Sequence, residues 1–463
     1  MTDIPGPQGS TTQTGHHSIA DRLERLPFSG FHRKFLLMVA AGEFVETMML
    51  LGNGTLLALV AVALKFSPTE ATKVVPVAFF AGEFVGSIGI GYLSDRFGRR
   101  TMFAYDLLIY GIAMIAAGFW SSPYLIALFI FIGGIGVGGE FPLVDSYTTE
   151  VFPGHHRGRR LAFVYTLAVI AAPVVAILAF AFSAWFPAFW AWRAIFWVIG
   201  ILALVVWLLR LQLPESPRWL EVRGRHDEAE AVIAKMEQDA MREHNLRELP
   251  PVDSPVRVEQ SPARWLDIWA PDLRSRTIMM LVFQFFQSGI FYGFTALAPI
   301  FLLHKGISLV HTLAFSMIIY SGFFVGSVVN IFIIDRVERK WGIVATAVLA
   351  GVVGTIFVLV PNVTATVVLG FFVAFILWNF SNFLHTYQAE IFPTRVRSMA
   401  AGTTYSVSRI STTIFLLIIT TYFLPLGLLP TYGFIWFLIL VVVVDIGVFG
   451  PLTSGKRLEA ISR

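Results

Sequence analysis

Apolar stretches of about 20 residues recur along this chain, and they restrict its fold more than any other feature. The first begins at Phe35 and the last ends at Gly450. A helix of that length crosses the roughly 30 Å hydrocarbon core of a bilayer. The sequence therefore predicts twelve membrane helices, at residues 35–62, 74–93, 102–120, 124–150, 160–183, 189–211, 277–302, 312–334, 342–360, 364–390, 398–422 and 430–450.

The composition agrees with a chain that needs lipid around it. Hydrophobic residues make up 56% of the sequence, charged residues only 14%, and the mean hydropathy is +0.71. Soluble proteins carry about 25% charged residues. Cysteine is absent, which excludes disulfides, thiolate metal sites and a cysteine nucleophile. We therefore expect an all-α membrane protein.

Most of the 34 Lys and Arg residues fall on one side of the predicted helices. Four of them precede the first helix, whose apolar stretch is too long for a cleavable signal peptide: Arg22, Arg25, Arg33 and Lys34. The residues on the opposite side are Lys65, Lys73, Arg193 and Lys305. Arg409 alone is predicted to lie within a helix. Because cytoplasmic loops retain positive residues, both termini are predicted to be cytoplasmic.

Two motifs of the first half recur in the second half at a single offset of 240 residues. DRFGR at 95–99 corresponds to DRVER at 335–339, and EVFPGHHR at 150–157 corresponds to EIFPTRVR at 390–397. This indicates a duplication, which transporters use to build two halves around a central path. The predicted division is a cytoplasmic segment 1–34, a six-helix bundle 35–211, a cytoplasmic connector 212–276, a second six-helix bundle 277–450 and a cytoplasmic tail 451–463. The connector is either a tether or an element that positions the halves.

Several of these motifs carry a family resemblance. GYLSDRFGRR at 91–100 is similar to the signature loop of the major facilitator superfamily, and PESPRWL at 214–220 resembles the start of the central loop in sugar porters, niacin transporters and organic-ion transporters. GGEFP at 138–142, followed by EVFPGHHRGR, resembles most the bacterial niacin and synaptic-vesicle-protein-like branch. The resemblance implies a secondary transporter in two pseudo-symmetric six-helix bundles, driven by a proton gradient without a cofactor.

Sugar porters fit less well. Their helix 7 carries a QxxQQxxGxN pattern, of which this chain keeps Gln284 and Gln287 but has Ser288, Phe291 and Gly293 at the other places. The second-half motif also departs from the usual form, with Glu338 where glycine is common.

Ionisable groups at membrane depth are costly and are functional candidates for that reason. Glu43, Glu46 and Asn53 share one face of the first helix, and Glu140 lies near mid-depth of the fourth. Two carboxylates so close in a poorly hydrated cavity do not both ionise easily, so one of them is suited to carry a proton. We therefore consider Glu43, Glu46 and Glu140 for proton coupling. The alternative is that one of the helix 1 acids pairs structurally with a neighbouring helix. Glu83, Asp145 and Asp445 are the other acids that we predict to be buried.

Arg409 has Tyr405 one turn before it on the same helix face. A guanidinium in a partly dry cavity can bind a substrate carboxylate through two hydrogen bonds. It can also neutralise a buried acid permanently, and the sequence leaves both readings open.

Polar and aromatic side chains on the seventh and tenth helices suggest a face for a flat heterocyclic substrate. They are Gln284, Gln287, Trp378, Asn382 and His385. The alternative is that such residues only join helices to one another. His385 stands alone, so no metal site is predicted. Gly134 and Gly138, one turn apart, indicate close helix packing.

Opposite charges recur at the cytoplasmic ends of helices in both halves. They are Asp95, Arg99, Glu150 and Arg157 in the first half and Asp335, Arg339, Glu390 and Arg397 in the second. Such pairs can hold an inner gate closed and break when the halves rock, as the resemblance implies. The alternative is that the positive residues only fix the topology.

These features favour proton-coupled uptake of a small organic acid by alternating access, with a niacin-like or other aromatic carboxylate as substrate. The alternatives are an organic cation transporter or proton-driven drug efflux pump, and a membrane sensor or receptor without turnover. An enzyme is not expected, because the sequence shows no nucleophile, metal cluster or cofactor motif. The expected partners are a small molecule, protons and membrane lipid, without nucleic acid, for a monomer in a cell inner membrane.

Overall fold

A computed structural model gives the fold and describes residues 19–152, 157–250, 265–334, 336–392 and 396–453. All regular elements of these residues are helices. Eleven of the described helices are long and apolar enough to cross a membrane, and Pro123–Val137 is a shorter apolar helix. A backbone in lipid must satisfy its hydrogen bonds within each segment, which explains why helices alone span the apolar stretches. The predicted all-α fold with twelve membrane helices in two bundles is confirmed.

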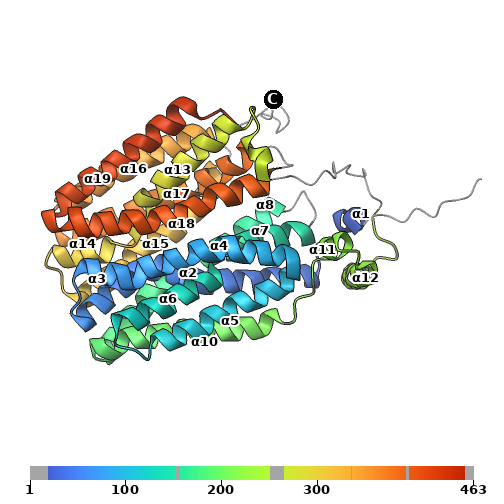
Figure 1. The fold of residues 1–463 in the computed structure, drawn as a ribbon, viewed down its shortest axis with the longest axis horizontal. Helices are drawn as coiled ribbons and strands as arrows, with labels where there is room; N and C mark the ends of the chain where they lie inside the picture. Colours follow the sequence, from blue (N-terminus) through green and yellow to red (C-terminus); the bar gives the residue numbers. More distant parts are fainter. Residues whose placement is uncertain (1–18, 153–156, 251–264, 335, 393–395, 454–463) are drawn as a thin grey trace, which may run out of the picture.

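The first bundle contains the residues from α2 to α10 (Figure 1). Its elements are α2 (Gly30–Leu64), α3 (Pro68–Thr72), η1 (Lys73–Val77), α4 (Ala78–Phe97), α5 (Arg99–Ala117), α6 (Pro123–Val137), α7 (Glu140–Val151), α8 (Arg157–Ala168), α9 (Ala171–Trp185) and α10 (Ala188–Arg210). The predicted fourth helix is divided into α6 and α7 at Gly138 and Gly139. This break makes Glu140 the first residue of a new helix.

The second bundle repeats this plan. Its elements are α13 (Arg274–Thr295), α14 (Ala298–His304), α15 (Leu309–Ile333), α16 (Arg339–Leu359), α17 (Val363–Ile391), α18 (Arg397–Ile418), η4 (Ile419–Phe423), η5 (Leu424–Leu426), α19 (Leu428–Val444) and η6 (Asp445–Phe449). The predicted seventh helix is divided into α13 and α14. Ser308 and Asn362 cap the N-termini of α15 and α17 by accepting hydrogen bonds from backbone N–H groups.

The two bundles lie side by side along a long seam (Figure 1). Helix α9 packs against α15, and α4 packs against α18. At one point Gly54 of α2 lies so close to the second bundle that a Cβ would be 2.7 Å from the carbonyl oxygen of Thr295. The Thr69 hydroxyl donates a hydrogen bond of 2.8 Å to the carbonyl of Thr420 across the same seam. Helices of both halves therefore enclose the space between the two bundles.

Three helices lie together beyond one end of the bundles, which we call the connector end (Figure 1). They are α1 (Ile19–Glu24), α11 (Pro217–Val222) and α12 (His226–His244); η3 (Trp265–Trp269) then precedes α13. Arg22 pairs with Glu237 at 2.6 Å, Arg25 pairs with Glu237 at 2.7 Å, and Arg33 pairs with Glu243 at 2.6 Å. These contacts bind α12 to α1 and to the start of α2, and whether the connector positions the two halves stays a prediction.

Candidate transport site

A cavity of about 110 Å³ lies between the two bundles. One water molecule needs roughly 10–15 Å³ of such space, so the cavity has room for a small organic molecule. Helices α2, α7 and α8 of the first bundle and α13, α17 and α18 of the second supply its wall. The lining residues are Thr47, Leu50, Leu51, Phe141, Tyr165, Ala168, Gln287, Phe291, Tyr292, Trp378, Ser381, Asn382, Leu384, His385, Tyr405 and Ser408.

Arg409 of α18 lies directly behind two tyrosines of this wall. Its Nη1 donates a hydrogen bond of 2.9 Å to the Tyr292 hydroxyl, and its Nη2 donates one of 3.1 Å to the Tyr405 hydroxyl. Its guanidinium carbon lies 5.6 Å from the ring centre of Phe141 and 4.9 Å from that of Tyr405. Arg409 is only 4% exposed. A buried cation therefore lies next to an aromatic cavity.

The counter-ion of Arg409 comes from the other bundle. Glu83 of α4 places Oε2 at 3.3 Å from Nη1 of Arg409, and both side chains are buried. Helix α4 reaches this position because it packs closely on α6, where a Cβ at Gly138 would lie 2.7 Å from the Cα of Glu83. The close packing predicted for Gly134 and Gly138 is thus confirmed. The reading that Arg409 neutralises a buried acid describes the arrangement seen here, although the sequence did not indicate which acid.

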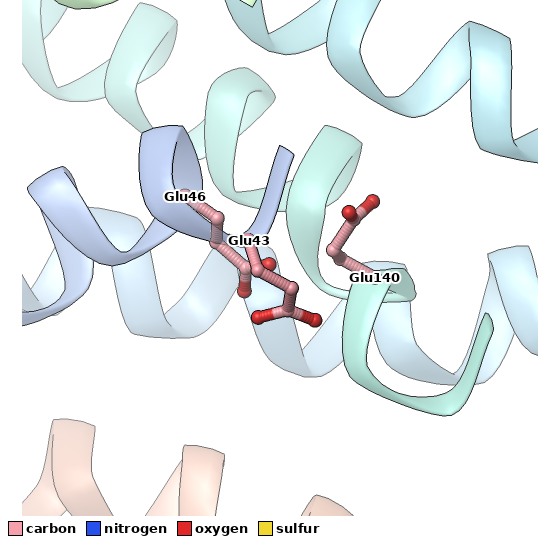
Figure 2. A group of neighbouring side chains, drawn as sticks. All are labelled: Glu43, Glu46 and Glu140. Carbon is pink, nitrogen blue, oxygen red and sulfur yellow. The ribbon is translucent and has the colours of Figure 1, made fainter. Parts of the chain in front are cut away.

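Glu43 and Glu46 project from α2, one turn before the cavity residues Thr47, Leu50 and Leu51, and Glu140 faces them from α7 (Figure 2). All three are fully buried, and each has a carboxylate oxygen within 4.8 Å of those of the other two. Neither oxygen of Glu46 has a hydrogen-bond partner among the described residues. The three acids considered for proton coupling therefore lie together beside the cavity.

Glu140 has a strong partner within the first bundle. Both of its oxygens accept hydrogen bonds from the guanidinium of Arg210, one of them at 2.9 Å, and Asp106 lies 3.5 Å from the same guanidinium. All three side chains are fully buried. Although the three acids of α2 and α7 are close enough to hold a cation, Arg210 already neutralises the Glu140 carboxylate.

Arg210 and Arg193 correct the expectation that Arg409 is the only cation within a helix. Both belong to α10, where Arg210 is 1% and Arg193 is 3% exposed. The Arg193 guanidinium donates hydrogen bonds to the carbonyls of Phe189 and Trp120 and lies 3.9 Å from the ring centre of Phe189. Both lie within the predicted helix 189–211, but so near its ends that they were counted with the charges outside the membrane. Asp106 was also missed, although it lies within the predicted helix 102–120.

The structure places most of the predicted substrate residues in the cavity wall. Those that line it are Gln287, Trp378, Asn382, His385 and Tyr405. Asn53 and Gln284 do not line it. The Asn53 amide is turned back toward the carbonyl of Leu50 at 3.4 Å, and Gln284 joins Gln287 to Gln388 through hydrogen bonds of 2.8 and 2.5 Å. Sequence spacing identified the correct helix faces but not the depth at which the cavity ends.

The predicted gating residues form equivalent ion pairs in the two bundles. Arg99 of α5 lies 3.2 Å from Glu150 of α7, and Arg339 of α16 lies 3.4 Å from Glu390 of α17. Each pair joins two helices of one bundle at the connector end, at positions related by the 240-residue offset. Asp335 and the side chains of Asp95, Arg157 and Arg397 lie outside the described residues.

The connector also reaches the first of these pairs. Glu215 accepts hydrogen bonds of 2.8 and 3.1 Å from the backbone N–H groups of Arg99 and Arg100. Burial raises the pKa of the Glu215 carboxyl, although these hydrogen bonds oppose the shift. The start of α5 is thus attached to the segment that joins the two bundles.

Twelve membrane helices in two similar bundles, with a polar and aromatic cavity between them, define a secondary transporter of the major facilitator superfamily. The sequence agrees, because residues 29–463 match the family "Sugar (and other) transporter". The chain belongs to this family and is a multi-pass membrane protein rather than an enzyme.

Relatives of similar length cover almost the whole chain. A putative metabolite transport protein, YyaJ, of Bacillus subtilis is 29% identical over 95% of this chain and 96% of its own length. The niacin transporter NiaP of Acinetobacter baylyi is 27% identical over 96% of this chain and 99% of its own length. Among solved structures, the xylose transporter XylE of E. coli in a partially occluded, inward-open conformation has a TM-score of 0.73 at 19% identity, covering 93% of this chain and 100% of its own. The structural likeness supports the fold.

Proposed function

We propose that this transporter couples the uptake of a small organic acid to protons by alternating access, with a niacin-like or other aromatic carboxylate as substrate. The observation that carries the proposal is the buried guanidinium of Arg409 behind the cavity wall. A guanidinium binds carboxylates strongly because its N–H groups match both oxygens. The name of the NiaP relative supports this substrate class.

The wall of the cavity suits a single aromatic ring. Tyr165, Phe291 and Trp378 offer ring faces or edges, while Asn382 and His385 offer hydrogen bonds at the same wall. A ring bound among them has its carboxylate directed at Tyr292 and Tyr405, the two side chains that hold Arg409. A carboxylate attached directly to an aromatic ring therefore fits better than one on a long flexible chain.

Proton coupling is assigned to the acids of α2. Glu43 and Glu46 are buried side by side, one turn from the cavity, and two such carboxylates repel each other when both are ionised. A proton on one of them relieves this repulsion. Glu140, the third predicted acid, is less suited to exchange a proton because Arg210 holds both of its oxygens.

An organic cation is the second candidate substrate. Its supporting observation is the same group of acids, which gives the first bundle three carboxylates beside the cavity. Proton-driven efflux of a cation would use the same residues in the opposite direction. A sensor without turnover is a third possibility, which accumulation of a labelled acid in sealed vesicles would exclude.

The remaining features follow from this reading. We place both termini and the connector in the cytoplasm of a cell with this protein in its inner membrane, as a monomer surrounded by lipid. The bundles 35–211 and 277–450 would rock about the cavity, and the Arg99–Glu150 and Arg339–Glu390 pairs would hold the inner gate.

The experiment is equilibrium binding of labelled nicotinate, benzoate and tetraethylammonium to the purified full chain at pH 5.5 and 7.5. We expect an aromatic acid to bind wild type, with binding lost in Arg409→Ala and altered in its pH dependence in Glu46→Gln. Asp445→Asn changes a buried acid outside the cavity wall and serves as the matched control. Binding of tetraethylammonium alone would contradict the proposal and identify a cation transporter.

A further inference from the structure

We infer that Glu83 is an internal substitute for the substrate carboxylate: the incoming acid displaces it from Arg409, and Glu83 then takes up a proton. The inference rests on the proposed uptake of an organic acid and adds a residue that this proposal does not use. Glu83 belongs to α4 of the first bundle and Arg409 to α18 of the second, so the exchange happens on the seam between them.

The ion pair of Glu83 with Arg409 is poorly bonded for a buried pair. Its closest atoms are 3.3 Å apart, and neither oxygen of Glu83 accepts a hydrogen bond from any described residue. In the same bundle Glu140 holds Arg210 with both oxygens. A buried pair is stable against exchange only when its geometry is good and its remaining lone pairs are satisfied. Glu83 therefore serves as the counter-ion of Arg409 without binding its guanidinium tightly.

A substrate can reach Arg409 from the cavity side. The hydroxyls of Tyr292 and Tyr405 accept hydrogen bonds from its two terminal nitrogens, and both tyrosines line the cavity, whereas Glu83 does not. A carboxylate that enters between the tyrosines meets Nη1, the nitrogen nearest to Glu83, together with Nη2, and so competes with Glu83 for the same guanidinium. It can accept two parallel N–H hydrogen bonds, which are roughly twice as strong as bonds between neutral groups.

Displacement leaves an ionised carboxylate without a cation. The titratable groups that interact electrostatically with Glu83 are Arg409, Tyr292, Tyr405, Tyr110 and Glu46. Only Arg409 among them is positive, and Arg210 is already paired with Glu140 and Asp106, so it is not free to compensate Glu83. Because an uncompensated buried charge is very costly, Glu83 binds a proton from water and a neutral carboxylic acid results. One proton is then taken up for each acid bound.

The exchange also changes what joins the two bundles. The Glu83–Arg409 pair crosses the seam between α4 and α18. When the substrate replaces Glu83, this link becomes a contact between the substrate and the second bundle alone. Binding and protonation together therefore release α4 from α18, which is a step that alternating access requires.

The test measures proton uptake from weakly buffered solution when nicotinate or benzoate is added to the purified full chain. Wild type and the Asp445→Asn control are expected to take up about one proton more for each acid bound than Glu83→Gln does, in addition to whatever the acids of α2 contribute. Glu83→Gln is also expected to bind the acid about tenfold more tightly because it has no internal competitor. Unchanged proton uptake by Glu83→Gln, or weaker binding by it, would overturn the inference.

A second measurement keeps the inference testable if neither acid binds wild type, which would be a failure of the proposed function alone. Infrared spectra of Arg409→Gln are compared with those of Arg409→Gln/Glu83→Gln, without substrate. Loss of the guanidinium is expected to leave Glu83 protonated, so a carboxylic acid C=O band present in the single variant disappears from the double variant. If the two spectra are identical in this region, Glu83 is not the group that Arg409 keeps ionised.

Discussion

The guanidinium of Arg210 occupies the space in which a side chain at Gly42 would lie. Gly42 belongs to α2 and immediately precedes Glu43, whereas Arg210 ends α10. The missing Cβ lets a cation enter the first bundle and reach Glu140 and Asp106. A small residue on one helix thus determines where the charge of another helix is held.

We expect Gly42→Ala to destabilise the protein strongly. The added methyl group would push the guanidinium away from Glu140 and leave buried charges unpaired, for which the cost is about 3–5 kcal/mol. Thermal unfolding in detergent, followed by tryptophan fluorescence, measures the effect. Gly402→Ala on α18 is the matched control, because a Cβ there meets no atom within 4 Å. Equal melting temperatures for the two variants would contradict the prediction.

The group of Arg210, Glu140 and Asp106 predicts which single substitutions reduce stability most. Arg210→Met leaves two carboxylates without a cation and should lower the free energy of unfolding by about 3–5 kcal/mol. Glu140→Gln should cost less, because Asp106 remains 3.5 Å from the guanidinium. Urea or thermal unfolding of the single variants gives the order, and the reverse order would show that Glu140 is not the main partner of Arg210.

The Arg99–Glu150 and Arg339–Glu390 pairs are expected to act alike. Each is partly buried, with side-chain exposures of 12% and 19% for the first pair and 10% and 23% for the second. If they hold the gate, Arg99→Ala and Arg339→Ala should each increase the reactivity of a single cysteine at the Ser408 position toward a reagent added from the connector side. Because the chain has no native cysteine, this label is unambiguous. Restoration by the charge swap Arg99→Glu/Glu150→Arg separates pairing from topology.

The docking of α12 on α1 is expected to persist at the acidic pH of a coupling assay. Burial opposes ionisation of Glu237, but hydrogen bonds from Arg22 and Arg25 outweigh it and hold the pKa of this carboxyl below its ordinary value. The stabilisation is therefore complete above the unfolded pKa of about 4.3 and is lost only as the pH falls through the lower folded value.

Amide hydrogen exchange of α1 measures this docking. Protection at pH 5.5 should equal that at pH 7.5 after correction for the intrinsic exchange rate. It should decrease in Glu237→Gln at both pH values. Glu221→Gln, a change of a connector acid on α11, is the control. Loss of protection between pH 7.5 and 5.5 in wild type would show that another group controls the docking.

Hydropathy and charge placement were sufficient to predict the helices, since each apolar stretch must form a helix in lipid whatever its neighbours are. The break between α6 and α7 was not predicted, because Gly138 and Gly139 interrupt the helix without interrupting the apolar pattern. Helical spacing was sufficient to predict that Trp378, Asn382 and His385 share one face of their helix. The partner of Arg409 could not be predicted, because Glu83 lies on the other bundle and only tertiary packing brings the two side chains together.

Helix α10 carries a buried cation near each of its ends, about 25 Å apart along the axis. Arg193 is bound to the carbonyls of Phe189 and Trp120, and Arg210 is bound to Glu140. Neither a slide along the axis nor a rotation about it is possible without moving a charge into hydrocarbon. The helix therefore keeps its position within the first bundle, as a bundle that rocks as a single body requires.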